Sequence, residues 1–390
     1  MMLFDFIYIP IILILGFLFI NLLKDKLTPY DKKMLQWLWI FHIMTGVYFC
    51  FFIEGDAFGY WEIPKSYTFE IFKNEFLHGD GTSFMNAFNY IFTNLLGMSY
   101  LSNTLLYSLF GFIGLTFFYL VALLSIPYNK VFLGFAVFPL VFFSPNLHFW
   151  SAGVGKDTIL FLCVGMLAYA LTNPAKRVVF IIISISLSFA IRPHITLFLL
   201  FAFGSTYVFG GRIPLTKKII FSTIFLGLAV AILPTVMTFV SVDSTSVEAI
   251  SKRAASQAGN LAQGAGSAVD ISEYPYVLKV LTFLYRPFFF DSSSIAGLIA
   301  SIENLLLVFL TIKAFIYRPL ETFRKAPFVL KGLFVFLAVG VLAFAPSLGN
   351  LGVMIRMRNM FLPGMLLYFM WCYSYQIKNK YSRSAVAEPK

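Results

Sequence analysis

The chain is built from long, uninterrupted apolar blocks, and this feature most restricts its fold. About eleven blocks are long enough to cross a bilayer core of roughly 30 Å. In lipid, only helices and closed barrels satisfy the backbone, and these blocks lack the alternation typical of barrel strands. The predicted spans are about 3–23, 35–53, 104–126, 131–145, 157–172, 178–191, 195–210, 219–241, 294–317, 328–346 and 360–376.

The composition supports this interpretation. Of the 390 residues, 59% are hydrophobic and 12% are charged, whereas soluble domains are about 45–50% apolar and about 25% charged. The sequence therefore predicts an all-α, polytopic transmembrane helical bundle rather than a soluble domain. We expect a single transmembrane domain at 1–377 and a cytoplasmic tail at 378–390.

The basic residues predict the orientation of the bundle, because Lys and Arg are enriched in cytoplasmic loops. They recur in alternate loops, which places the N-terminus outside and the C-terminus in the cytoplasm. The loops are 24–33, Lys130, Lys176–Arg177, Arg212 with Lys217–Lys218, Arg318 with Arg324–Lys325, and the tail with Lys378, Lys380 and Arg383. The net charge of +11 is then a topology signal, attracted to anionic membrane lipid, and we expect no nucleic-acid partner.

One short apolar segment, 278–290, ends at Arg286–Pro287. The alternation of loops holds only if this segment does not cross the membrane, so we expect it to be re-entrant or interfacial. Two long loops are then external. The loop 54–103 mixes aromatic and acidic residues and predicts short amphipathic helices on the membrane. The loop 242–277 is rich in Ala, Ser and Gly and is typical of a mobile flap with a little helix.

Several charged residues lie at or near membrane depth, where such groups are energetically unfavourable and usually functional. The orientation places all of them on the outer face, in separate loops. They are Asp56, Lys156, Asp157, Arg192 with His194, Arg286, Arg356 and Arg358. Four neighbouring spans are short, so we expect their outer ends to stop inside the bilayer. These loops would then line an outward-open cavity.

Such a cavity suits a lipid-linked phosphosugar. Cations hold phosphate or pyrophosphate, and the fork of arginine matches it in a bidentate manner. A carboxylate removes a proton from an acceptor hydroxyl, and the same cations stabilise the departing phosphate.

Short motifs carry a resemblance to a known family. Gly55-Asp56-Ala57…Tyr60, after a span in a long first external loop, resembles the GT-C superfamily of integral-membrane glycosyltransferases. Further motifs are similar to bacterial polysaccharide-polymerase-type membrane proteins: Ser144-Pro145…Phe149-Trp150-Ser151…Lys156-Asp157, Arg286-Pro287-Phe288, Glu303-Asn304 and Gly349-Asn350…Arg356…Arg358.

The resemblance implies a GT-C-like fold in the bacterial cytoplasmic membrane. It also implies transfer from a polyprenyl-phosphate- or pyrophosphate-linked donor to a glycan acceptor. Asp56 occupies the position of the catalytic carboxylate, but Ala57 follows it where the family usually has a second acid. This departure leaves open the identity of the base and the use of a divalent cation.

The candidate catalytic residues are Asp56 and its flanking acids Glu54 and Glu62. The candidate substrate-binding residues are Tyr60, Lys156, Asp157, Arg192, His194, Arg286, Arg356 and Arg358. Because Arg356 and Arg358 are two positions apart, we expect one to bind substrate and the other to anchor. In polymerase and ligase relatives the key residues are arginines of later external loops, a role that Arg286, Arg356 and Arg358 could fill.

Structural roles compete with each assignment. Asp56 could cap a helix, Lys156 and Asp157 could form a local ion pair, and Arg192 and His194 could extend to the membrane interface. The four histidines are scattered, so no zinc centre is expected. A lipid-linked oligosaccharide flippase or other transporter, an acyltransferase and a non-catalytic scaffold remain alternatives.

Overall fold

The computed structural model describes residues 4–53, 55–127, 137–210, 214–240, 246–263, 266–292 and 294–387. These residues form helices joined by short connections, and the described ranges contain no strand; an isolated antiparallel bridge links Ala268 to Asn350. The all-α prediction is therefore confirmed. The chain divides into two compact units, Met1–Leu120 with Phe142–Arg192, and Val121–Val141 with Pro193–Lys390.

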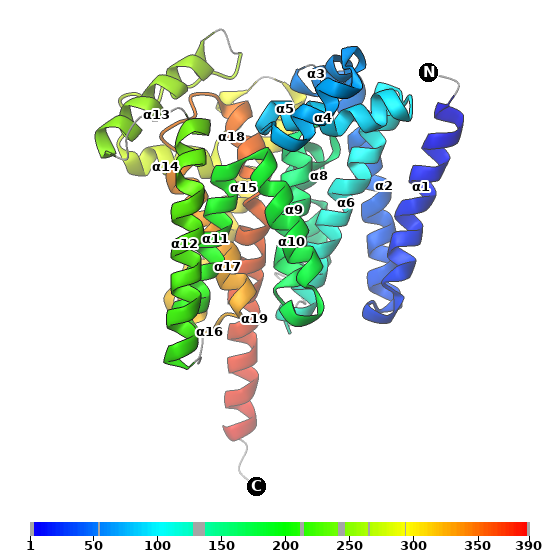
Figure 1. The fold of residues 1–390 in the computed structure, drawn as a ribbon. Coiled ribbons are helices and arrows are strands. Elements are labelled where there is room, and N and C mark those ends of the chain that lie inside the picture. Colours follow the sequence, from blue (N-terminus) through cyan, green and yellow to red (C-terminus); the bar gives the residue numbers. More distant parts are fainter. Residues whose placement is uncertain are drawn as a thin grey trace. The chain divides into compact units, whose positions relative to one another are not determined.

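Unit 1 contains the N-terminal helices, which Figure 1 shows in blue to green. They are α1 (Asp5–Leu22), η1 (Lys24–Lys26), α2 (Pro29–Phe52), α3 (Asp56–Glu62), η2 (Ile63–Ser66), α4 (Phe69–His78), α5 (Gly81–Tyr90), η3 (Ile91–Leu95), most of α6 (Tyr100–Ser125), α8 (Pro145–Ala152), α9 (Lys156–Ala170), η5 (Pro174–Lys176) and α10 (Val178–Ile191). The η3 segment is a π-helix.

Local sequence explains how the α1–α2 pair forms. Thr28 caps α2, since its side chain accepts a hydrogen bond from the Asp31 backbone N–H while the Asp31 carboxylate accepts from the Thr28 backbone. Pro29 occupies the first helical position, where a missing N–H is tolerated. Trp39 then lies against Gly16, and its indole N–H donates to the Leu13 carbonyl at 3.1 Å. The small Gly16 therefore allows α1 to pack on the large Trp39 ring of α2.

Charged residues mark the two ends of unit 1. At one end, the Lys26 ammonium donates to the Tyr169 hydroxyl at 2.9 Å, and the Arg177 guanidinium lies 3.8 Å from the centre of the same ring. At the other end, Ser99 donates to the Asp5 carboxylate at 2.7 Å, and α3, α4 and α5 lie nearby (Figure 1). The basic segments 24–26 and 176–177 thus meet at the end opposite to α3–α5.

Unit 2 contains the remaining helices. They are α7 (Val137–Leu140), α11 (Pro193–Gly210), α12 (Leu215–Val240), α13 (Val247–Ala262), α14 (Tyr276–Tyr285), η6 (Phe289–Asp291), α15 (Ile295–Ile316), α16 (Pro319–Lys325), α17 (Phe328–Phe344), α18 (Leu351–Arg358) and α19 (Leu362–Ala387); η4 (Val141–Phe143) joins the two units. Helix α17 packs between α11 and α19, because Gly332 admits the Phe203 ring and Gly364 approaches the Leu333 backbone.

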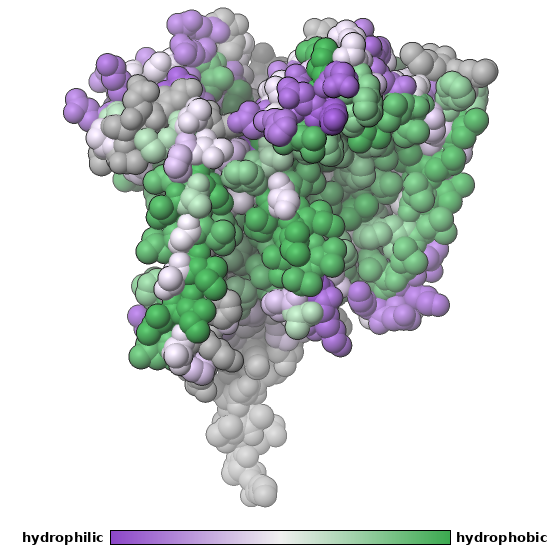
Figure 2. Space-filling model, in the orientation of Figure 1, coloured by the Kyte–Doolittle hydropathy of each residue, from purple (hydrophilic) through white to green (hydrophobic). Residues whose placement is uncertain are grey.

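The exposed surface of several helices is apolar. By length and composition, five described helices could cross a membrane, or six if the bent pair α8–α9 counts as one span. Figure 2 shows a green apolar surface over α1 and α10 within unit 1, and purple polar residues gather toward the two ends of this unit. Exposed residues on these two helices include Phe6, Ile7, Ile14, Leu18, Val179 and Ile182. Such a surface suits lipid rather than water.

The number of spans is smaller by this criterion than the sequence predicts. Helices α10, α14 and α17 are apolar but shorter than 18 residues, as is the segment Pro193–Phe209 of α11. The predicted span 131–145 falls partly on residues 131–136, outside the described ranges. The eleven-span topology therefore stays a prediction. Helix α14 has ten residues and rises about 15 Å, half the thickness of a bilayer core.

Both long loops contain helices, as their composition predicts. Helix α4 is exposed, as expected of a surface helix, but most of α5 is buried. In the loop 242–277, α13 is held by Asn350, whose amide donates to the Leu261 carbonyl at 3.4 Å and accepts from Ser267 at 2.9 Å. This loop is thus attached to the start of α18.

Candidate functional site

The break between α8 and α9 positions two charged residues in unit 1. The two helices meet at an angle of 118°, and Gly155 ends the break with a φ of 155°. This backbone conformation favours glycine over residues with a side chain. As a result, Lys156 and Asp157 form the first turn of α9. A carboxylate in this position interacts favourably with the positive end of the helix dipole, whereas a lysine interacts unfavourably with it.

Lys156 contacts residues outside its own helix. Its ammonium donates to the Thr82 hydroxyl at 2.8 Å and lies 6.0 Å from the centre of the Tyr60 ring. Tyr60 is buried and lies one helical turn after Asp56 in α3. Since residues four apart share a helix face, Asp56 lies on the face of α3 that Tyr60 presents to Lys156.

Asp157 pairs with Arg192, 35 positions further along the chain. The guanidinium lies 3.2 Å from the carboxylate, and the two side chains are 14% and 8% exposed. Arg192 follows the last turn of α10, where its backbone N–H donates to the Ser188 carbonyl. This ion pair therefore joins the end of α10 to the start of α9, and it brings two predicted substrate-binding residues together.

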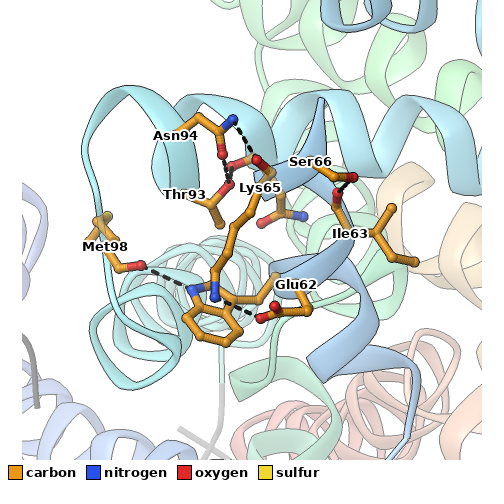
Figure 3. Close-up of polar contacts among 9 residues, drawn as sticks. Glu62, Ile63, Lys65, Ser66, Thr93, Asn94 and Met98 are labelled. Carbon is orange, nitrogen blue, oxygen red and sulfur yellow. Dashed lines mark hydrogen bonds and ion pairs between the residues drawn. The ribbon is translucent and has the colours of Figure 1, made fainter. Parts of the chain in front are cut away.

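The three candidate catalytic acids have different surroundings. Asp56 is exposed at the start of α3, and Glu54 lies outside the residues that the structure describes. Glu62 accepts a hydrogen bond from Lys65 at 2.6 Å, and its side chain is 51% exposed (Figure 3). Of the two described acids, Asp56 shares the face of Tyr60, whereas Glu62 belongs to a local surface pair.

Figure 3 shows what surrounds Glu62. The Lys65 ammonium lies 3.1 Å from the centre of the Trp61 ring, and the Trp61 indole N–H donates to the Met98 carbonyl at 2.9 Å. The Asn94 amide donates to the Lys65 carbonyl at 3.5 Å. These contacts hold α3 and η2 against η3. The Glu62–Lys65 pair therefore lies among contacts that stabilise the fold.

In unit 2, Arg286 forms a bidentate pair with Asp291. The Arg286 Nε lies 3.0 Å from one carboxylate oxygen and an Nη contacts the other. Burial alone would raise the pKa of Asp291, but the hydrogen bonds from Arg286 and from the Phe288 backbone outweigh it and lower that pKa. The hydrogen bond to Asp291 raises the pKa of Arg286 in turn. The pair fixes the turn that follows α14.

Arg358 lies at the centre of a second cluster and is 1% exposed. Its guanidinium donates to the Leu284 carbonyl and, at 2.6 Å, to the Asn304 side chain. The Asn304 amide donates to the Pro287 carbonyl at 2.8 Å. Asn304 lies about 14 Å along α15, a helix that rises about 33 Å. Arg358 therefore anchors the end of α14 near the middle of α15.

The remaining predicted residues lie elsewhere in unit 2. Arg356 is half-buried on α18, two positions before the buried Arg358, so the two arginines have different surroundings, as their spacing predicts. The His194 ring packs edge-on against Phe198 and Phe344. The structure thus gathers the predicted residues into two groups, Asp56, Tyr60, Lys156, Asp157 and Arg192 in unit 1, and Arg286 and Arg358 in unit 2.

Sequence reasoning missed a row of polar residues on α5. Thr82, Asn86 and Asn89 follow each other at intervals of four and three, which places them on one helix face. Thr82 contacts Lys156, whereas Asn86 and Asn89 are buried. The helical spacing of these residues was the signal that could have revealed them.

The chemistry available in unit 1 is that of cations beside carboxylates. Within the described ranges, no group of three or more His, Cys, Asp or Glu side chains is arranged to hold a metal ion. Comparisons with protein-family models, with curated proteins and with solved structures found no significant match to this chain.

Proposed function

We propose that this chain is a membrane glycosyltransferase or polysaccharide polymerase. It transfers a sugar or oligosaccharide unit from a polyprenyl-phosphate-linked donor to a glycan acceptor. The observation that carries the proposal is the arrangement around the α8–α9 break, where Lys156, the Asp157–Arg192 pair and the face of α3 bearing Asp56 and Tyr60 lie together.

Lys156 is the phosphate-binding residue of this proposal. A lysine in the first turn of a helix opposes the dipole, but an anion bound there is attracted by both the ammonium and the first backbone N–H groups. Arg192 is paired with Asp157 at 3.2 Å, so it holds the α9 terminus in place and adds positive charge beside the phosphate.

Asp56 is the general base. Its carboxylate takes the proton of the acceptor hydroxyl while that oxygen attacks the anomeric carbon of the donor. The bond from the anomeric carbon to the phosphate oxygen breaks, and the lipid phosphate leaves with the electron pair. Lys156 stabilises the charge that develops on this phosphate, which is the role of a preorganised cation in such a step.

The proposed location is the outer face of a bacterial cytoplasmic membrane. In unit 1 the basic residues Lys26 and Arg177 meet at the end opposite to α3–α5. Since basic residues favour the cytoplasmic side, the end with Lys156 faces outward. The same rule gives the eleven-span topology, with 278–290 re-entrant, the N-terminus outside and the C-terminus in the cytoplasm.

The test compares Asp56→Asn with Glu62→Gln, a matched neutral substitution in the same helix. We expect Asp56→Asn to insert and fold normally but to abolish glycan assembly in cells that depend on this chain. Glu62→Gln should assemble glycan at the normal level, because Glu62 pairs with Lys65. Normal polymer length and amount in Asp56→Asn would refute the assignment.

A second candidate function is a lipid-linked oligosaccharide flippase or other transporter. The observation that favours it is Arg358, a buried cation near the middle of α15, with the buried Glu303 beside Asn304 on that helix. Charges at such depth are typical of translocation pathways. Proteoliposomes that contain the purified chain and a fluorescent lipid-linked sugar separate the two functions. Translocation without any glycosyl transfer would favour the transporter.

A further inference from the structure

A layer of neutral polar side chains is buried between α5 and α6 in unit 1. We call Asn86, Asn89, Asn103 and Tyr107 the polar layer; their side chains are 5%, 0%, 0% and 0% exposed. The Asn103 amide donates to the Asn89 side-chain oxygen at 3.1 Å, and the Asn86 amide donates to the Tyr67 hydroxyl at 3.2 Å. Such side chains are usually fully hydrogen-bonded when buried.

Three atoms of this layer have no hydrogen-bond partner among the described residues. They are the side-chain oxygens of Asn86 and Asn103 and the hydroxyl of Tyr107. Leaving such atoms unpaired in the interior is unfavourable. The Tyr107 side chain interacts electrostatically with Asn89 and Tyr60, and the Lys156 ammonium lies 6.0 Å from the centre of the Tyr60 ring.

The chemistry of these atoms indicates what would satisfy them. Two are acceptors and one is a phenol, so the complementary ligand presents several donors. An ionised ligand group would be strongly disfavoured in this buried layer, which has no formal charge of its own. The surrounding rings are Phe88 and Phe110, whose centres lie 6.5 and 5.8 Å from that of Tyr107. Hydroxyl groups on an apolar ring face, as in a sugar, fit both features.

The backbone around the layer has the features of a segment that can move. Helix α5 continues into the π-helix η3, a form that is frequent at functional sites. Gly81 and Gly97 bound this segment with φ angles of 55° and 58°, and small residues at element ends often serve as hinges. A rotation of 81–97 about these glycines would admit a ligand to the polar layer.

We propose that the polar layer is the binding subsite for the uncharged carbohydrate part of the substrate, next to the phosphate held by Lys156. Thr82 joins the two, since it contacts Lys156 and lies one turn before Asn86 on α5. This inference rests on the proposed function, because it takes the phosphate site at Lys156 as given. It adds that unit 1 selects its donor by sugar hydroxyls and not by lipid phosphate alone.

The experiment measures binding to the full chain in nanodiscs with two kinds of probe. One is farnesyl phosphate, and the other is farnesyl phosphate linked to glucose, galactose or N-acetylglucosamine. We expect at least one sugar-linked probe to bind about tenfold more tightly than farnesyl phosphate, as a few buried hydrogen bonds would provide. The absence of a sugar-dependent gain for every probe, including no binding at all, would overturn the subsite.

Variants then locate the gain. Asn89→Leu/Asn103→Leu removes both partners of one hydrogen bond, so its melting temperature should not fall, whereas the gain should disappear and affinity for farnesyl phosphate should remain. Tyr107→Phe, which removes a single unpartnered oxygen, should reduce the sugar-dependent gain in affinity about threefold. This single variant still tests the subsite if the double variant does not fold. The control is Thr116→Val, whose hydroxyl bonds within α6 to Phe112.

The outcomes separate this inference from the proposed function. An undiminished gain in Tyr107→Phe and in Asn89→Leu/Asn103→Leu would show that the layer does not bind the sugar, and it would overturn the subsite. Loss of glycan assembly in Asp56→Asn without any sugar-dependent binding would leave the function standing and refute the subsite alone. Sugar-dependent binding with normal assembly in Asp56→Asn would support the subsite and refute the assigned base.

Discussion

The two units hold a deep arginine in opposite ways. In unit 1, Arg192 pairs with the carboxylate of Asp157, and the neighbouring Lys156 remains half-exposed beside the face of α3. In unit 2, Arg358 is 1% exposed and donates to a backbone carbonyl and to the Asn304 side chain. The first arrangement pairs the guanidinium with an opposite charge, whereas the second has an architectural role, because the guanidinium joins α14, α15 and α18 through neutral oxygens. Arginines of similar sequence context can thus have either kind of partner.

Removing the architectural arginine should have the largest effect. In Arg358→Met, the carbonyls of α14 and the Asn304 side chain lose this donor, and Glu303 loses a favourable electrostatic interaction with the guanidinium. Breaking a buried charged cluster from one side destabilises a protein by on the order of 3–5 kcal/mol. We expect a large fall in melting temperature, measured by thermal unfolding in detergent.

Arg356→Met is the matched control, because Arg356 is half-buried two positions earlier on the same helix. Its melting temperature should change little in comparison. Equal melting temperatures for the wild type and Arg358→Met would show that the guanidinium is not an anchor. The comparison between the two units would then fail.

Part of this contrast could be predicted from the sequence. A spacing of two on a helix places Arg356 and Arg358 on different faces, and α18 has this geometry. Continuous apolar blocks predict the all-α fold because lipid leaves helices as the simplest solution for the backbone. The grouping of basic residues 24–26 and 176–177 at one end of unit 1 follows from the same pattern of alternating loops.

Other parts depend on tertiary structure that no local pattern records. The Asp157–Arg192 pair joins positions 35 apart, and neither residue specifies the other. Helices α4 and α5 have similar amphipathic sequences, yet α4 is exposed and α5 is buried. Amphipathicity predicts that one face is covered but not what covers it. For this reason the sequence placed both helices on the membrane surface.

The Asp157–Arg192 pair should give the next largest effect. We expect the single variants Asp157→Asn and Arg192→Gln to lose stability and to lower glycan assembly, since each leaves a part-buried charge without its partner. In a double-mutant cycle, the coupling free energy should be about 0.5–3 kcal/mol, the range for residues that share an ion pair. Purely additive losses would mean that the two side chains act independently.

Acid should weaken unit 2 through the Arg286–Asp291 pair. The pKa of Asp291 is lowered in the folded state, so the unfolded chain binds a proton more readily. The stabilisation is therefore present above the unfolded pKa of about 3.9 and is lost as pH falls through the folded pKa. We expect the melting temperature to decline in that range, and to decline less steeply in Asp291→Asn. Parallel pH profiles for the two proteins would contradict the assigned role.

The smallest effect should come from the Glu62–Lys65 pair, which lies near the proposed site but on the surface. The two side chains are 51% and 32% exposed, and an exposed ion pair contributes at most about 1 kcal/mol. Glu62→Gln should therefore unfold at nearly the wild-type temperature and keep glycan assembly. Lys65→Met should cost more, because the Lys65 ammonium also lies over the Trp61 ring. A loss of assembly in Glu62→Gln with unchanged stability would move the catalytic base from Asp56 to Glu62, and it would show that sharing the helix face of Tyr60 does not identify the base.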